Sequence, residues 1–188
     1  MSEGLVRAHA TLERGARFLG AGLRPGQGRA PAAISGQYRA KVIGNGLREL
    51  DRFLNLLLDE ASFRLGLPVR PAQRNTANKL RTFRASTGIE GEKDEVRLRA
   101  LGRSRDCLFH SGGIVTRGDV REGRRMTAGW GGPGLADGLQ SFGIGEELVV
   151  TDADIAGICA FYEALAAEIV ASSAAPRALT RRRTEPPD

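Results

Sequence analysis

The sequence predicts a mainly α-helical bundle of about four to five helices, with a glycine-rich loop or small β-hairpin inserted before the last helix. Apolar residues recur every three or four positions over several long segments, which is the period of a helix buried on one side. Hydrophobic residues make up 41% of the chain but aromatic residues only 5%. Leu, Val, Ile and Ala must therefore supply most of the buried surface, which favours helix packing over a β-sandwich.

A chain of 188 residues suits one domain with a single core. We expect an N-terminal helix and linker over 1–34, a helical domain over 35–171 and a disordered tail over 172–188. The tail is polar, with an arginine run at 181–183 and two prolines near its end.

The first half of the chain carries one weak and one strong helical pattern. Residues 4–22 have the weak pattern, and the helix breakers of 24–31 predict a linker after it. The strong pattern runs from 43 to 61 and should carry much of the core. Gly66 and Pro68 predict its end, because glycine accepts a left-handed conformation and proline cannot continue the helix.

Two further helices are predicted over 72–86 and 92–109, the second with an acidic first turn that the helix dipole favours. Glycine is then frequent and the helical period disappears over 111–145. Short extended segments at 125–130 and 147–150 predict a small hairpin. Thr151 and the acidic residues after it predict the start of a final helix.

The chain has a net charge of +6, and Lys41, Lys79 and Lys93 are its only lysines. Arginine pairs bidentately with phosphate, so nucleic acid is the first partner to consider. A GC-rich genome would also enrich arginine. The arginines expected to contact RNA lie on the outer sides of helices 72–86 and 92–109, and are Arg81, Arg84, Arg97, Arg99 and Arg103.

No metal or other cofactor is expected. Cys107 and Cys159 form no CxxC pair, and the two histidines of the chain are far apart. No stretch reaches the roughly 20 apolar residues of a membrane span, and no signal-peptide core is present. We therefore expect a cytoplasmic protein without membrane contact.

The one candidate active site is Arg105-Asp106-Cys107-Leu108-Phe109-His110, at the end of an amphipathic helix and before Ser111-Gly112-Gly113. This segment resembles the motif of HEPN-domain proteins, in which an arginine and a polar residue precede a histidine. The likeness extends over residues 40–170. Asp106 stands where asparagine is commoner in the family, and the glycine-rich segment 116–145 matches no known part of it.

The resemblance implies a HEPN-like helical bundle and a metal-independent endoribonuclease, in which a ribose 2′-hydroxyl attacks the adjacent phosphate. His110 would move the proton, since an imidazole exchanges protons near neutral pH. Arg105 would hold the phosphate and its developing charge. Asp106 lies four positions before His110, on the same helix face, and could orient the imidazole. The helix end would let His110 turn toward Arg105.

The resemblance also implies a homodimer with a cleft shared between protomers, which would bring a second His110 to the phosphate. A toxin or defence effector, with an antitoxin protein as its partner, is the expected biological setting. We predict RNA as the substrate.

Other interpretations remain open at this stage. The chain could be a non-catalytic HEPN-like domain that binds RNA or protein, or a basic helical nucleic-acid-binding module. His110 could simply stabilise the end of its helix while Arg105 pairs with an acidic residue such as Glu60. Trp130 could stack on a base, although a lone loop tryptophan more often covers a core edge.

Overall fold

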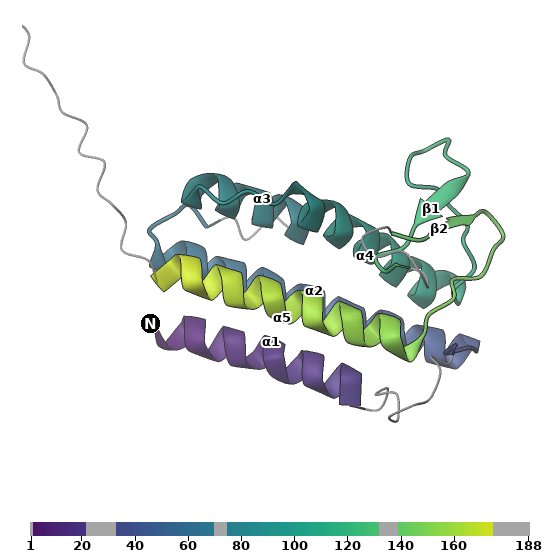
Figure 1. Ribbon diagram of the computed structural model, residues 1–188, viewed down its shortest axis with the longest axis horizontal. Coiled ribbons are helices and arrows are strands. Elements are labelled where there is room, and N and C mark those ends of the chain that lie inside the picture. Colours follow the sequence, from purple (N-terminus) through teal and green to yellow (C-terminus); the bar gives the residue numbers. More distant parts are fainter. Residues whose placement is uncertain (1, 22–32, 70–74, 132–138, 175–188) are drawn as a thin grey trace, which may run out of the picture.

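The computed structural model describes residues 2–21, 33–69, 75–131 and 139–174. Five helices and one two-stranded antiparallel sheet in these residues confirm the mainly α-helical prediction. In Figure 1, α3 and α4 lie above α2 and α5, and α1 lies below them. The elements are α1 (Glu3–Ala21), α2 (Gln37–Arg64), α3 (Thr76–Thr87), α4 (Glu92–Ser111), β1 (Arg125–Thr127), β2 (Ser141–Gly143) and α5 (Asp152–Ala174).

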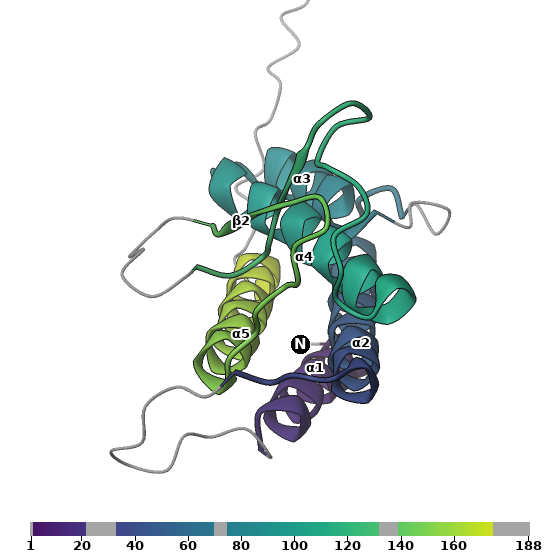
Figure 2. The ribbon, with the colours of Figure 1, turned by 90° about the vertical axis from the view of Figure 1, so that its right-hand side faces the viewer.

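The long helix α2 is the centre of the bundle and contacts each of the four other helices. Its buried leucines, including Leu47, Leu54 and Leu57, follow the helical period that predicted it. Helix α1 belongs to the same core, because Leu5 and Leu12 are fully buried and the helix packs on both α2 and α5. The N-terminal helix is thus part of the bundle, as Figure 2 shows in the view along the helices.

Helix α5 is long and apolar enough to cross a membrane by length and composition alone, although the sequence predicted no such stretch. A core helix of a globular bundle passes the same test. Here Ile155, Ile158, Leu165 and Ile169 are buried in the common core. Its start is fixed as predicted: Thr151 Oγ1 accepts a hydrogen bond from Asp154 N (3.1 Å), and Thr151 N donates to Asp154 Oδ2 (2.9 Å).

The helix boundaries agree with the turn chemistry in the sequence. Gly66 follows α2 with φ of 64°, the left-handed conformation predicted for it. Helix α3 begins at Thr76, four residues later than expected, because Asn75 caps it by accepting from Asn78 N at 3.1 Å. The predicted linker 24–31 lies outside the described residues.

The hairpin has a different second strand from the one predicted. Strand β1 pairs with β2, placing Met126 opposite Phe142, and both side chains are buried. The segment 147–150 instead joins the glycine turn to the bundle: Glu147 forms a single bridge with Ile114, and Leu148 and Val150 are buried. Its backbone pairs only briefly, and with other segments than β1: Leu148 N donates to Gly113 O (2.8 Å), and Ile34 N donates to Val150 O (2.7 Å).

The predicted tail begins too early. Helix α5 continues to Ala174, so residues 172–174 are helical. The remaining residues of the predicted tail, 175–188, lie outside the described part of the chain.

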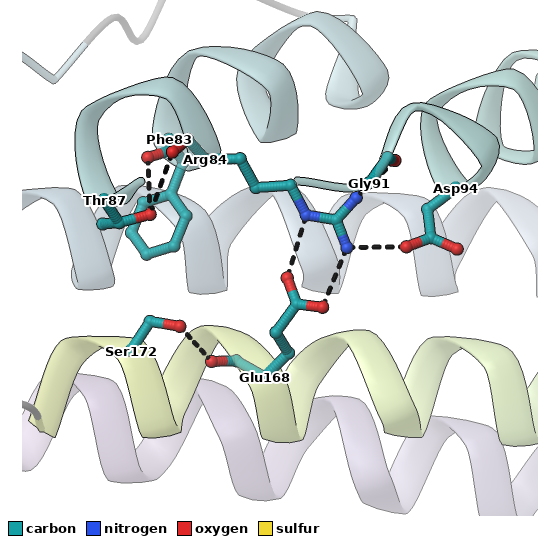
Figure 3. Close-up of polar contacts among 7 residues, drawn as sticks. All are labelled: Phe83, Arg84, Thr87, Gly91, Asp94, Glu168 and Ser172. Carbon is teal, nitrogen blue, oxygen red and sulfur yellow. Dashed lines mark hydrogen bonds and ion pairs between the residues drawn. The ribbon is translucent and has the colours of Figure 1, made fainter. Parts of the chain in front are cut away.

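A buried arginine joins three helices. Arg84 of α3 is only 2% exposed and donates to Glu168 of α5 through Nε and Nη2, both at 2.9 Å. The same guanidinium donates to Asp94 Oδ2 (2.6 Å) and to Gly91 O (2.7 Å), so α4 is tied in as well (Figure 3). Arg84 was expected to contact RNA, but these bonds occupy its guanidinium inside the fold.

Candidate functional site

The candidate site lies along one face of α4. Arg99, Arg103, Asp106 and His110 follow one another at steps of four, three and four residues, which places them in a row on the helix surface. The helix ends after Ser111, two residues later than predicted, because Gly112 takes φ of 62° and Gly113 N donates to Cys107 O at 3.1 Å.

A cavity of about 550 Å³ opens over the C-terminal half of this row. Its α4 wall contains Arg103, Asp106 and His110, and its other wall is the segment that follows the glycine turn, including Thr116 and Arg117. Both Asp106 and His110 are exposed to solvent. The cavity therefore brings an imidazole, a carboxylate and two guanidinium groups together at an open surface.

The loop that forms the second wall is held in place by Asp119. Its carboxylate accepts from Thr127 N (2.9 Å) and from Thr127 Oγ1 (2.6 Å), which closes the loop on β1. Arg103 Nε lies 2.7 Å from Asp119 Oδ1, so the loop is also joined to α4. This ion pair fixes the guanidinium of Arg103 at the boundary between helix and loop.

His110 remains inside the last turn of α4 and does not turn toward Arg105. Its ring stands edge-on to Phe109, with centroids 4.9 Å apart. Asp106 shares the cavity with His110, as their spacing predicted, but its Oδ1 accepts a hydrogen bond from Arg105 Nε at 2.9 Å. Among the described contacts none joins Asp106 to His110, so Asp106 is near the imidazole without a bond that orients it.

Arg105 lies in a neighbouring cavity of about 320 Å³ between α2, α3 and α4. Arg103 and Asp106 line both cavities, so the two are adjacent. Arg105 Nη1 is 3.3 Å from Asp51 Oδ2, so its second acidic partner is Asp51 and not Glu60. Helix α2 comes this close because of Gly44, where a Cβ atom would lie 3.2 Å from the carbonyl oxygen of Arg105.

The ionisable side chains around Arg105 shift one another's pKa values. Burial raises the pKa of Asp51, although a hydrogen bond with Thr76 and the charge of Arg105 act in the opposite direction. Burial acts to lower the pKa of Arg105, but Asp106 and Asp51 outweigh it and raise that pKa. Tyr162 lies close to both and is fully buried, which raises its pKa well above the usual value. Arg105 is therefore held as a cation between two carboxylates.

The five arginines expected to bind RNA fall into different environments. Arg99 and Arg103 line the two cavities, and Arg81 is exposed on α3. Arg97 packs on the ring of Phe161 at 4.3 Å and donates through Nε to Gly129 O at 3.1 Å. Together with Arg84, Arg97 is thus engaged in the fold and is not open to a ligand.

The tryptophan, one of the cysteines and the second histidine of the chain, His9, each contact other parts of the fold. Trp130 is 1% exposed and donates through Nε1 to Val149 O at 3.0 Å, so it covers the core and does not offer a face to a base. Cys107 lines the His110 cavity, and its thiol lies 3.2 Å from Ile114 O. His9 is paired loosely with Glu13 on α1, at 3.8 Å.

Sequence reasoning missed Arg117, Asp51 and Thr76. Arg117 follows the glycine turn, and only the return of that turn over α4 places it beside His110. The spacing of Arg103 to His110, seven residues, was a usable signal, since two full helical turns bring these positions to one face. Among the described residues, no group of three or more His, Cys, Asp or Glu side chains is arranged to hold a metal ion.

Comparison with known proteins adds no relative. No family model, curated protein or solved structure matches this chain.

Proposed function

We propose that this protein is an endoribonuclease of HEPN type that cleaves RNA in the cavity beside His110, without a metal ion. The observation that carries the proposal is the row on α4, where Arg103, Asp106 and His110 face one open cavity with Arg117 opposite. An imidazole beside guanidinium groups is the combination that proton transfer and phosphate binding require.

In the proposed reaction the 2′-oxygen of a ribose attacks the adjacent phosphorus, and the bond from phosphorus to the 5′-oxygen breaks. The 2′-hydroxyl proton passes to a base, the leaving 5′-oxygen takes up a proton, and a 2′,3′-cyclic phosphate remains. We assign these two proton transfers to His110 and Asp106, which both line the cavity. Each chain therefore carries a complete set of groups for the reaction.

The structure changes the proposed role of the arginines. Arg103 is the α4 arginine in the same cavity as His110. Its Nε is paired with Asp119, so we assign the phosphate contact to its Nη groups, with Arg117 on the facing wall. Arg105 acts from the adjoining cavity, where its hydrogen bond to Asp106 fixes the position of that carboxylate. Substituting Arg103 with Gln should therefore reduce cleavage more than substituting Arg105 with Gln, measured under single-turnover conditions on folded protein.

The direct test is incubation of purified protein with mixed RNA in EDTA, beside His110→Ala. Arg17→Gln is a matched control, because Arg17 is exposed on α1, on the other side of the bundle from α4 and the hairpin (Figure 2). We expect the wild type and the control to cleave and His110→Ala to lose cleavage. Equal cleavage by His110→Ala and wild type would remove His110 from the mechanism.

RNA binding without cleavage is the second candidate function, favoured by the bond that ties Asp106 to Arg105 and not to His110. In that case the wild type and His110→Ala both leave RNA intact and bind it, and their affinity for RNA falls steeply as the salt concentration rises. A toxin or defence role with an antitoxin partner is part of the same proposal. Toxicity on overexpression that His110→Ala relieves would support it.

A further inference from the structure

A second cavity adjoins the His110 cavity and opens over the other half of the row on α4. It is the cavity of about 320 Å³ between α2, α3 and α4. Arg103 and Asp106 line both cavities, whereas Arg99 lines the second and not the first, so we call the second the Arg99 cavity. A strand bound beside His110 therefore has an adjoining cavity to enter, with one guanidinium at the boundary and another beyond it.

Arg99 has hydrogen-bond donors to spare. Its side chain is 35% exposed, and its two polar contacts are long: Nη2 lies 3.6 Å from Glu95 Oε2 and 3.4 Å from Asn78 Oδ1. Within the described residues, Nε and Nη1 of Arg99 make no hydrogen bond or ion pair. Because a guanidinium has five N–H donors, Arg99 can bind an anion through these groups and keep its contact with Glu95.

The carboxylates that line the Arg99 cavity are both paired with Arg105. Asp51 Oδ2 lies 3.3 Å from Arg105 Nη1, and Asp106 Oδ1 lies 2.9 Å from Arg105 Nε. The N-terminal end of α3 lines the same cavity, and the dipole of a helix is positive at this end. Arg105 is thus committed to the fold, and Arg99 is the cation of this cavity that a negatively charged ligand can use.

Gly102 leaves the wall of the cavity open between Arg99 and Arg103. It lies inside α4 and lines the Arg99 cavity, and a Cβ atom there would have no atom from the rest of the described chain within 4 Å. Glycine inside a helix is less stable than alanine, and no close packing among the described residues requires it here. A glycine in such a place lets a ligand come close to the helix backbone.

The spacing of the two arginines suits consecutive phosphates of one strand. Arg99 and Arg103 are four residues apart, about 6 Å along the helix axis, and side chains at this spacing are neighbours on the helix surface. In the proposed reaction the Nη groups of Arg103 hold the scissile phosphate, so the phosphate one nucleotide further along the strand comes within reach of Arg99. Grooves that bind single strands follow the backbone with positive charges in this way.

We propose that the Arg99 cavity binds the phosphate next to the scissile one, so that an RNA strand runs along α4 from His110 towards Arg99. This subsite rests on the proposed function, because RNA is taken as the ligand of the His110 cavity. It makes the substrate an RNA with at least two phosphates in these cavities. Contacts to phosphate carry no sequence information, so the subsite adds affinity for RNA of any sequence.

The test measures the binding of an RNA that cannot be cleaved, a fully 2′-O-methylated oligonucleotide of about eight nucleotides, over a range of salt concentrations. Each phosphate contact to a single strand contributes about 0.7 to the slope of log affinity against log salt. Arg99→Gln should therefore reduce this slope by about 0.7 and weaken binding about tenfold at low salt. Arg17→Gln, on α1, is the matched control and should keep the wild-type slope.

A second variant leaves every ion pair in place. Arg99→Gln removes the described partner of Glu95, which is 7% exposed, and can disturb the fold for that reason. Gly102→Leu instead fills the open space beside Arg99 and should weaken RNA binding by a similar factor, while Gly102→Ala, with a smaller side chain, should weaken it less. Circular dichroism would check that each variant is folded.

A wild-type slope for folded Arg99→Gln would overturn the proposal, and so would Gly102→Leu that binds RNA as tightly as the wild type. Cleavage is measured separately, so the subsite and the proposed function fail in different ways. If the wild type cleaves RNA but these variants bind it normally, the subsite is wrong and the cleavage proposal stands. If no RNA is cleaved but both variants weaken binding as expected, the subsite stands and the catalytic role of His110 is wrong.

Discussion

Replacing Arg84 with Met should destabilise the bundle by about 3 kcal/mol. The guanidinium makes four hydrogen bonds to Glu168, Asp94 and Gly91, and its side chain is only 3% exposed. Removing one partner of a buried ion pair typically costs about 3–5 kcal/mol, because the other charge is left without compensation. Here Glu168 and Asp94 are each about a third exposed, so water can partly hydrate them and the lower end applies.

The assay is urea unfolding of the wild type and Arg84→Met, with Arg81→Met as the control. Arg81 is exposed, and its substitution should change the free energy of unfolding by less than about 0.5 kcal/mol. Changing Glu168 to Leu together with Arg84→Met should recover part of the loss, since one unpaired carboxylate is removed as well. A loss below about 1 kcal/mol for Arg84→Met would refute the reasoning, and so would a drop in RNA affinity of the folded variant while stability is unchanged.

Two other predictions use the perturbed groups near the site. Because burial raises the pKa of Asp51, the folded state holds this proton more tightly than the unfolded state, so the contribution of Asp51 to stability falls as pH rises from about 3.8. Unfolding measured from pH 3 to 6 should show the wild type losing stability relative to Asp51→Asn over this interval, and a relative gain would contradict the account. Burial raises the pKa of both Cys107 and Cys159 from 9.0 to about 11, so the native thiolate fraction at pH 8 is about a hundredfold below that of the unfolded chain. A thiol reagent should therefore react much more slowly with native protein than in urea, and equal rates would show that the thiols are accessible and normal.

The helices were predictable because the alternation of apolar and polar residues is local information. The rows that include Leu47, Leu54 and Ile158 are buried as their spacing indicated, and Gly66, Gly112 and Thr151 mark helix ends through their own backbone or side-chain chemistry. The second strand was misplaced, since 147–150 has an alternating pattern but pairs with no strand of the hairpin. Burial of alternate residues produces the same short pattern in a segment that makes only isolated bridges, as 147–150 does with Ile114.

The candidate site was predictable only in part. Asp106 and His110 share a cavity, as four helical positions require, but which arginine joins them depended on the tertiary fold. Arg105 pairs in the neighbouring cavity with Asp51, which is distant in sequence and is brought close by the packing of α2 on α4. Arg84 was assigned to RNA because its partner Glu168 lies 84 residues away and could not be anticipated from local sequence.

The chemical ends left on cleaved RNA test the central claim most directly. If His110 and the cavity arginines act on a ribose 2′-hydroxyl, a defined RNA treated in EDTA should give a 2′,3′-cyclic phosphate and a 5′-hydroxyl. The same RNA with a 2′-O-methyl group at the cleaved position should stay intact. Products with 3′-hydroxyl and 5′-phosphate ends, or cleavage of the methylated RNA at that position, would contradict the account.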